Sequence, residues 1–178
     1  IPLVFFITLG MIIAIALSYL RSTAVIENIV KTGMERETRA VVKQMNLWLR
    51  ARKTDLVTWS ANEVYRDALV ETGYYGESAR KGATETLTNL IKGYPYYINM
   101  FLAGHDGHVL VAANNRGIGL DIRDRHYYQI AITGQQYISD VIISLVDEQK
   151  IFMCAVPVKE EGSVIGVLVG VIPMSAFS

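Results

Sequence analysis

The segment Arg125-His126-Tyr127-Tyr128 carries the side chains best suited to bind an anion. An arginine at the start of a short helix offers a planar, bidentate fork to a carboxylate, and the free amides of the helix terminus favour negative charge. The two tyrosines supply an apolar wall beside it. In the alternative arrangement, Arg125 pairs with Asp121 or Asp124 and the tyrosines fill the core. The segment therefore predicts either a carboxylate clamp or a structural ion pair.

Further side chains could complete a pocket around this clamp. Asp140 and Ser144 lie on an expected third strand, and Tyr94 and Tyr96 could close the pocket from the other side. Each of these residues fits plain packing equally well. The predicted ligand site consists of Arg125, Tyr127, Tyr128, Asp140, Ser144 and Phe101.

Metal and catalytic chemistry find little support in the sequence. His105 and His108 resemble a metal pair, but only an Asp-Gly turn separates them and no third ligand is evident, so solvated hairpin residues are favoured. No nucleophile–base pair and no phosphate-binding glycine loop is evident. The single cysteine, Cys154, lies in an apolar run and is expected to be a buried, unreactive side chain. We therefore expect no metal, no cofactor and no catalytic residue.

Residues 1–20 form an uncharged, apolar stretch. At about 1.5 Å per helical residue, the stretch matches the roughly 30 Å hydrocarbon core of a bilayer. No basic region precedes it and no small-x-small cleavage site follows it, which favours a membrane anchor over a cleaved signal peptide. Lys plus Arg and Asp plus Glu number 17 each, so nothing marks a nucleic-acid partner. We expect an inner-membrane protein whose chain after Arg21 lies outside the cytoplasm.

Helical periodicity continues over residues 21–70. An apolar stripe runs along this segment through Val30, Met34, Val41, Met45 and Trp48. Such a stripe is buried either on its own domain or on a second copy of the helix, and a parallel pair next to a membrane suits its length. We expect a homodimer through this stripe, with internal packing as the alternative. Trp48 and Trp59 would be dimer contacts in the first arrangement and core residues in the second.

Residues 71–178 predict an α+β module. Helices are expected over 79–92 and over 123–133, the second capped by Asp121 or Asp124. Alternating or continuous apolar runs predict strands over 97–103, 108–113, 150–158 and 164–172, and residues 137–138 together with 141–145 are expected to give one further strand. The last two runs are apolar almost throughout, so we place them at the centre of the sheet. The predicted fold is an anchor and a long helix followed by a PAS-like, five-stranded antiparallel sheet with flanking helices.

The order of four segments resembles the Cache family, the extracellular sensor domains of bacterial chemoreceptors, sensor kinases and cyclic-dinucleotide enzymes. The matching segments are 101–110, 121–128, 137–140 and 155–167. The resemblance covers nearly the whole chain. It implies the membrane-distal half of a double Cache receptor, with a second module and a second membrane helix expected beyond Ser178.

In the resembled family, an Arg-x-aromatic-aromatic segment holds the ligand's carboxylate, and residues 125–128 match it position for position. The amino-acid-binding branch adds two tyrosines and an aspartate that holds the ammonium group. Here those positions fall on Leu120, about Ile142 and about Val171. Because a buried cation without a counter-charge costs several kcal/mol, the resemblance implies a small carboxylate that lacks an amine.

The function predicted is ligand sensing by the ectodomain of a transmembrane signalling receptor. A chemoreceptor is the first candidate, and a histidine kinase or diguanylate cyclase is the second. Ligand binding would pass a shift along the long helix into the membrane. The competing class is an enzyme or a haem- or metal-bearing domain, for example one that uses His126 as a haem ligand. A ligand-free dimerisation module is the third possibility.

Overall fold

The computed structural model describes residues 11, 37 and 39–177, and the chain divides into two compact units, Ile1–Asn46 and Leu47–Ser178. In the first unit residues 39–46 are helical. Almost all of the predicted anchor, and Val30 and Met34 of the stripe, lie outside the described residues. In the part of the chain that is described, no helix combines the length and the apolar character needed to cross a bilayer.

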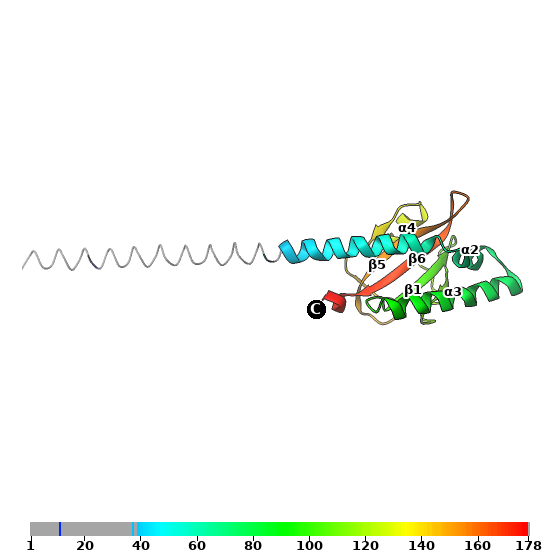
Figure 1. Cartoon of the computed structure of the whole chain (residues 1–178), viewed down its shortest axis with the longest axis horizontal. Coiled ribbons are helices and arrows are strands. Elements are labelled where there is room, and N and C mark those ends of the chain that lie inside the picture. The colour runs from blue at the N-terminus through cyan, green and yellow to red at the C-terminus, as the bar shows by residue number, and fades with distance from the viewer. Residues whose placement is uncertain (1–10, 12–36, 38, 178) are drawn as a thin grey trace, which may run out of the picture. The chain divides into compact units, whose positions relative to one another are not determined.

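An antiparallel sheet forms the centre of the second unit (Figure 1). The strand order is β2-β1-β6-β5-β3, and β4 also pairs with β5. The strands are β1 (Asn99–Gly104), β2 (Val109–Ala112), β3 (Tyr137–Ile138), β4 (Ile142–Ile143), β5 (Lys150–Glu160) and β6 (Ser163–Pro173). The α+β class with an antiparallel sheet is confirmed, but the sheet has six strands where the sequence predicted five.

The additional strand arises because segments 137–138 and 141–145, predicted to form one strand, form two separate strands on either side of Ser139. The backbone N–H of Ser139 donates to the carbonyl of Met153 over 2.8 Å, and the Ser139 hydroxyl oxygen accepts from the Met153 N–H over 2.9 Å. The side chain thus takes the place of a backbone partner, which interrupts the ladder. Pairing resumes at Ile142, opposite Ile151.

Strands β5 and β6 form one long hairpin, and nearly all their residues are buried. Glu161 and Gly162 at its turn have φ angles of 48° and 86°, as a two-residue turn with the twist of a hairpin requires. β6 lies between β1 and β5, so the predicted central position of these apolar strands is confirmed.

Alternate residues of each strand point to opposite faces of the sheet. Both faces are covered by other elements. On one face, Phe101, Met153 and Val169 join a buried cluster with Tyr127 and Tyr128 of helix α4 (His126–Ile132). The other face is covered by residues 47–60, helix α2 (Glu63–Val70) and helix α3 (Gly73–Gly93) (Figure 1).

That second face packs closely at β6. A Cβ atom added to Gly170 would lie 2.6 Å from the ring of Tyr97 and 3.1 Å from Leu56, both of which are buried. A side chain at this position would therefore force the N-terminal helix away from the sheet. Glycine lets the strand and the helices meet.

The helix boundaries differ from those predicted. The helix described from residue 39 ends at Ser60, and α2 begins separately because the Asn62 side chain accepts a hydrogen bond from the Val64 N–H over 3.0 Å. Helix α3 begins at Gly73, six residues before the predicted start. Helix α4 begins at His126 with Arg125 at the N-cap and no side-chain cap, so the predicted caps Asp121 and Asp124 are wrong.

Candidate ligand-binding site

A cavity of about 290 Å³ opens between β1, the open end of the β5–β6 hairpin, the β4–β5 loop and the segment that leads into α4. Its walls are mostly apolar. They include Ile98, Phe101, Val109, Leu120, Ile122, Ile142, Ile151, Met153 and Val171. Among the described residues, three charged side chains line it, namely Arg116, Arg125 and Asp147. An apolar cavity with a few convergent polar groups is the usual form of a small-molecule site.

Arg125 is half-buried at the start of α4 and lines this cavity. Its backbone is fixed, because its N–H donates to the Ile122 carbonyl and its own carbonyl accepts from the N–H groups of Tyr128 and Gln129, all within 3.0 Å. Within the described part of the chain, its guanidinium forms no ion pair with a carboxylate. A charged fork in an apolar wall is thus available to an anion.

The acidic partner that the alternative arrangement gave to Arg125 is engaged elsewhere. Nε of Arg123 lies 3.0 Å from each carboxylate oxygen of Asp121, and the Arg123 N–H binds the same carboxylate. These bonds from Arg123 lower the pKa of Asp121 to about 2. In the described part of the chain neither Asp121 nor Asp124 forms an ion pair with Arg125, so the structure does not have the alternative arrangement.

Tyr127 lines the cavity beside Arg125 and is 4% exposed. Burial raises the pKa of its hydroxyl to about 12, although the positive charge of Arg125 lowers it somewhat. The hydroxyl therefore keeps its proton at neutral pH and can donate a hydrogen bond. No group among the described residues accepts one from it.

Phe101 and Ser144, both predicted for the site, also line the cavity. Phe101 contributes an apolar face from β1. The Ser144 hydroxyl oxygen accepts hydrogen bonds from the backbone N–H groups of Val146 and Asp147, over 3.2 Å and 3.4 Å, which shapes the β4–β5 loop.

Tyr128 and Asp140 do not line the cavity. The Tyr128 hydroxyl donates to the carbonyl oxygens of Gly104 and His105, each at 2.9 Å, and so ties α4 to the β1–β2 turn. Asp140 lies exposed at the break between β3 and β4.

Tyr94 and Tyr96 also lie away from the cavity. The Tyr94 ring lies 4.8 Å from the ring of Trp59, and the Tyr96 ring lies 5.1 Å from that of Trp48. These aromatic contacts join the start of β1 to the N-terminal helix. Both tryptophans are therefore internal packing residues.

Sequence reasoning missed Arg116 and Asp147, which lie in loops at the rim of the cavity. No periodic pattern reports which loop residues face a cavity. The three positions that the resemblance assigns to ligand contacts, Leu120, Ile142 and Val171, all line the cavity. Their side chains are apolar, so none can hold an ammonium group.

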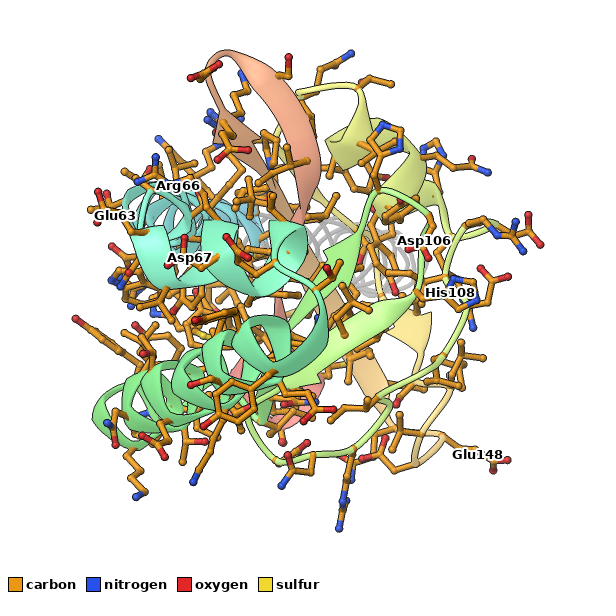
Figure 2. All side chains as sticks on the ribbon, turned by 90° about the vertical axis from the view of Figure 1, so that its right-hand side faces the viewer. Glu63, Arg66, Asp67, Asp106, His108 and Glu148 are labelled. Carbon is orange, nitrogen blue, oxygen red and sulfur yellow. The ribbon has the colours of Figure 1, made fainter. Side chains whose placement is uncertain are left out.

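The two histidines predicted to be solvated lie at the β1–β2 turn. Nδ1 of His108 lies 3.1 Å from a carboxylate oxygen of Asp106, and Figure 2 shows these two side chains together while Glu148 projects from another loop. Within the described residues, no three His, Cys, Asp or Glu side chains are grouped to hold a metal ion. Of the predicted Asp-Gly turn, only Gly107 has a positive φ, 81°.

Cys154 is fully buried on β5, as the sequence predicted. Burial raises the pKa of its thiol to about 12, so the thiolate is absent at neutral pH. Since the thiolate is the reactive form, this cysteine is a packing residue.

No family model matches the sequence, and no curated protein matches it. Solved structures do share its fold. The sensor domain of the V. cholerae histidine kinase DctB aligns with a TM-score of 0.67 and 18% identity, over 80% of this chain and 57% of that one.

Two chemoreceptor domains are also similar. The ligand-binding domain of Pseudomonas fluorescens CtaA, in complex with L-serine, has a TM-score of 0.57 and 16% identity over 78% of this chain and 56% of that one. That of Campylobacter jejuni Tlp3, with L-norvaline, has a TM-score of 0.56 and 17% identity over 80% and 56%. The chain thus spans little more than half the length of these structures. The fold is that of the ligand-binding sensor domains of chemoreceptors and histidine kinases, which confirms the predicted Cache-type fold.

Proposed function

We propose that this chain is the extracellular or periplasmic sensing domain of a bacterial transmembrane receptor, and that it binds a small carboxylate in the cavity beside Arg125. The fold supports the sensing role, because the similar structures are sensor and ligand-binding domains. The observation that carries the ligand class is the half-buried Arg125, without an acidic partner among the described residues, next to the protonated hydroxyl of Tyr127.

The proposed ligand carries no amine at the carbon next to its carboxylate. CtaA and Tlp3 are solved with amino acids bound, yet here Leu120, Ile142 and Val171 surround the corresponding space with apolar side chains. Asp147 is the one carboxylate among the described lining residues, and it is exposed, so water screens its charge. A buried ammonium group would find no counter-charge in this wall.

The parent protein that we propose is a chemoreceptor anchored in the inner membrane. A histidine kinase is the second candidate, favoured by the similarity to the DctB sensor domain. Both parents use the same ectodomain chemistry, so the ligand test below applies to either.

Isothermal titration of the purified full chain in mild detergent tests the ligand class. Butyrate should bind and butyramide should not, because the amide offers no charge to the guanidinium. Arg125→Ala should lose about 2 to 5 kcal/mol of binding, as truncation of one member of a buried charge pair does. Arg125→Lys should recover little, since an ammonium group cannot reproduce the planar fork.

Arg123→Ala is the matched control. It removes an arginine two residues away whose guanidinium is bound to Asp121 outside the cavity, so carboxylate affinity should stay at the wild-type value. Unchanged affinity in Arg125→Ala, or a clear preference for 2-aminobutyrate over butyrate, would contradict the proposal.

A further inference from the structure

A second cavity lies on the other face of the sheet. It has a volume of about 330 Å³ and opens where the end of the N-terminal helix, the start of α2 and the second half of α3 meet. A water molecule takes up about 30 Å³ of liquid, whereas cavities that bind small ligands begin at about 300 Å³. The second cavity is therefore large enough for an organic molecule.

Tyr65 lines this cavity and has a hydroxyl that lacks a partner. The residue is fully buried, and no group in the described part of the chain accepts a hydrogen bond from this hydroxyl. Burial raises the pKa of the hydroxyl well above its usual range, so it keeps its proton at neutral pH. A buried donor without an acceptor destabilises a fold, and an acceptor that a ligand supplies would remove this cost.

The other polar groups of the lining indicate what kind of acceptor fits. The Asn62 side-chain oxygen accepts from the Val64 N–H over 3.0 Å, while its amide N–H groups have no partner among the described residues. The hydroxyls of Thr58 and Thr86 donate to carbonyls four residues earlier in their own helices. The unused donors are therefore those of Tyr65 and Asn62. A carbonyl oxygen has two lone pairs and can accept from both.

The walls of the cavity carry no charge in the part of the chain that is described. Trp59, Ala61 and Leu90 supply apolar surface. Glu63 and Arg66 of α2 do not line the cavity and pair with each other at 3.4 Å (Figure 2). An ion placed in this cavity would lose water without gaining a counter-charge, which is costly. The lining thus favours a neutral and partly apolar ligand.

We propose that the second cavity binds a small uncharged carbonyl compound, whose oxygen accepts a hydrogen bond from the Tyr65 hydroxyl and whose hydrocarbon part packs against Trp59 and Leu90. This cavity shares no described lining residue with the cavity beside Arg125. The proposal therefore goes beyond the sensing role given above and does not depend on it.

Titration of the full chain with cyclohexanone, followed by NMR after ¹⁵N labelling of tryptophan, tests the site. The chain has two tryptophans, of which Trp59 lines the cavity and Trp48 does not. The indole N–H signal of Trp59 should shift to saturation while that of Trp48 stays in place, and Trp48→Phe assigns the two signals. Cyclohexylammonium has the same ring with a charge and no acceptor, so it should shift neither signal.

Tyr65→Phe removes only the proposed donor. The dissociation constant of cyclohexanone should rise about two- to tenfold, the range for one hydrogen bond between uncharged groups. The Tm should not fall, because the hydroxyl has no partner to lose. Tyr97→Phe is the matched control, since Tyr97 is buried on the same face but its hydroxyl donates to the Arg52 carbonyl over 3.2 Å. This variant should lower the Tm and leave the dissociation constant unchanged.

The shift of Trp59 should persist in Arg125→Ala, in which the carboxylate clamp is removed. A Trp59 signal that does not move, as expected of a cavity filled with water alone, would overturn the proposal. Equal shifts of both tryptophans, or a shift of Trp59 by cyclohexylammonium, would do so too. An unchanged dissociation constant in Tyr65→Phe would show that the hydroxyl does not hold the ligand. None of these results bears on Arg125, so the carboxylate function would stand or fall separately.

Discussion

Tyr127 and Tyr128 are neighbours in sequence but have different surroundings. Both are 4% exposed, yet Tyr127 lines the cavity with a hydroxyl that is free of partners among the described residues, whereas the Tyr128 hydroxyl donates to two carbonyl oxygens of the β1–β2 turn. The first hydroxyl is available to a ligand and the second is committed to the fold. Substitution by phenylalanine removes only the hydroxyl, so the pair offers a direct comparison.

Tyr127→Phe should weaken carboxylate binding by about 1.5 kcal/mol, the lower end for a hydrogen bond to a charged group, with little change in stability. Because burial raises the pKa of Tyr127 to about 12, the hydroxyl stays protonated well above neutrality. Wild-type affinity should therefore be constant between about pH 6 and 8, the range in which most proteins are close to maximal stability. Titration calorimetry across that range measures both effects. An inflection near neutral pH, or wild-type affinity in Tyr127→Phe, would refute this role.

Tyr128→Phe should have the opposite profile. The carbonyl of His105 loses its donor, and that of Gly104 keeps only the bond from the Gly107 N–H. The free energy of unfolding should fall by about 0.5 to 1.5 kcal/mol, the net contribution of a typical hydrogen bond, because Gly104 keeps a donor and the His105 carbonyl is only partly buried. Denaturant unfolding measures this loss. Carboxylate affinity should not change, and a binding defect as large as that of Tyr127→Phe would mean that Tyr128 contacts the ligand.

The residue types of the clamp could be predicted from sequence, but their pairing could not. Helical pattern alone allows Asp121 to cap α4 or to pair with Arg125. In the structure, Asp121 forms an isolated β-bridge with His108, so its backbone is extended and its carboxylate turns to Arg123. That bridge is a contact across 13 positions, which local spacing does not report. The rim residues Arg116 and Asp147 escaped prediction for the same reason.

At the scale of elements, the break before α2 depends on one side chain. Asn62→Ala removes the hydrogen bond to the Val64 N–H, and loss of an N-cap costs about 1 kcal/mol. Thermal unfolding should show a lower Tm. Asn62→Asp is the matched control, because its carboxylate can still accept the bond and interacts favourably with the helix dipole. Equal Tm values for the alanine and aspartate variants would show that the cap contributes nothing.

Apolar periodicity predicted where elements lie but not where they are interrupted. The spacing continues through Asn62, because Tyr65 and Ala68 of α2 are buried like Leu56 before them. Segments 137–138 and 141–145 are likewise predicted to form one strand, whereas a short strand on either side of Ser139 pairs separately with β5. In both cases a polar side chain takes a backbone partner and ends an element. Around Asn62 the spacing of buried residues is kept, so apolar periodicity alone predicts one continuous helix there.

At the scale of the molecule, β6 connects the proposed site to the N-terminal helix. Val171 lines the cavity, and six residues later Phe177 packs its ring 5.0 Å from that of Trp48. Phe177 also lies 5.6 Å from Phe152 of β5. A ligand that displaces β6 would therefore act on the helix through this aromatic contact. The α+β class could be predicted from the sequence because the apolar pattern indicates the order of helices and strands.

The contact between Trp48 and Phe177 leaves fewer residues of the predicted dimer stripe available to a second copy of the helix. Trp48 is half-buried against its own domain, whereas Val41 is 65% exposed and Leu47 is 58% exposed. We predict that the chain associates through the exposed part, since apolar side chains on a helix face favour pairing with a second helix. Val41→Glu should shift the full chain in detergent toward the monomer in sedimentation velocity. Gln44→Glu, with the same charge change at an exposed position of the same helix, should not. An identical mass distribution for wild type and both variants would show that association, where it occurs, uses another surface.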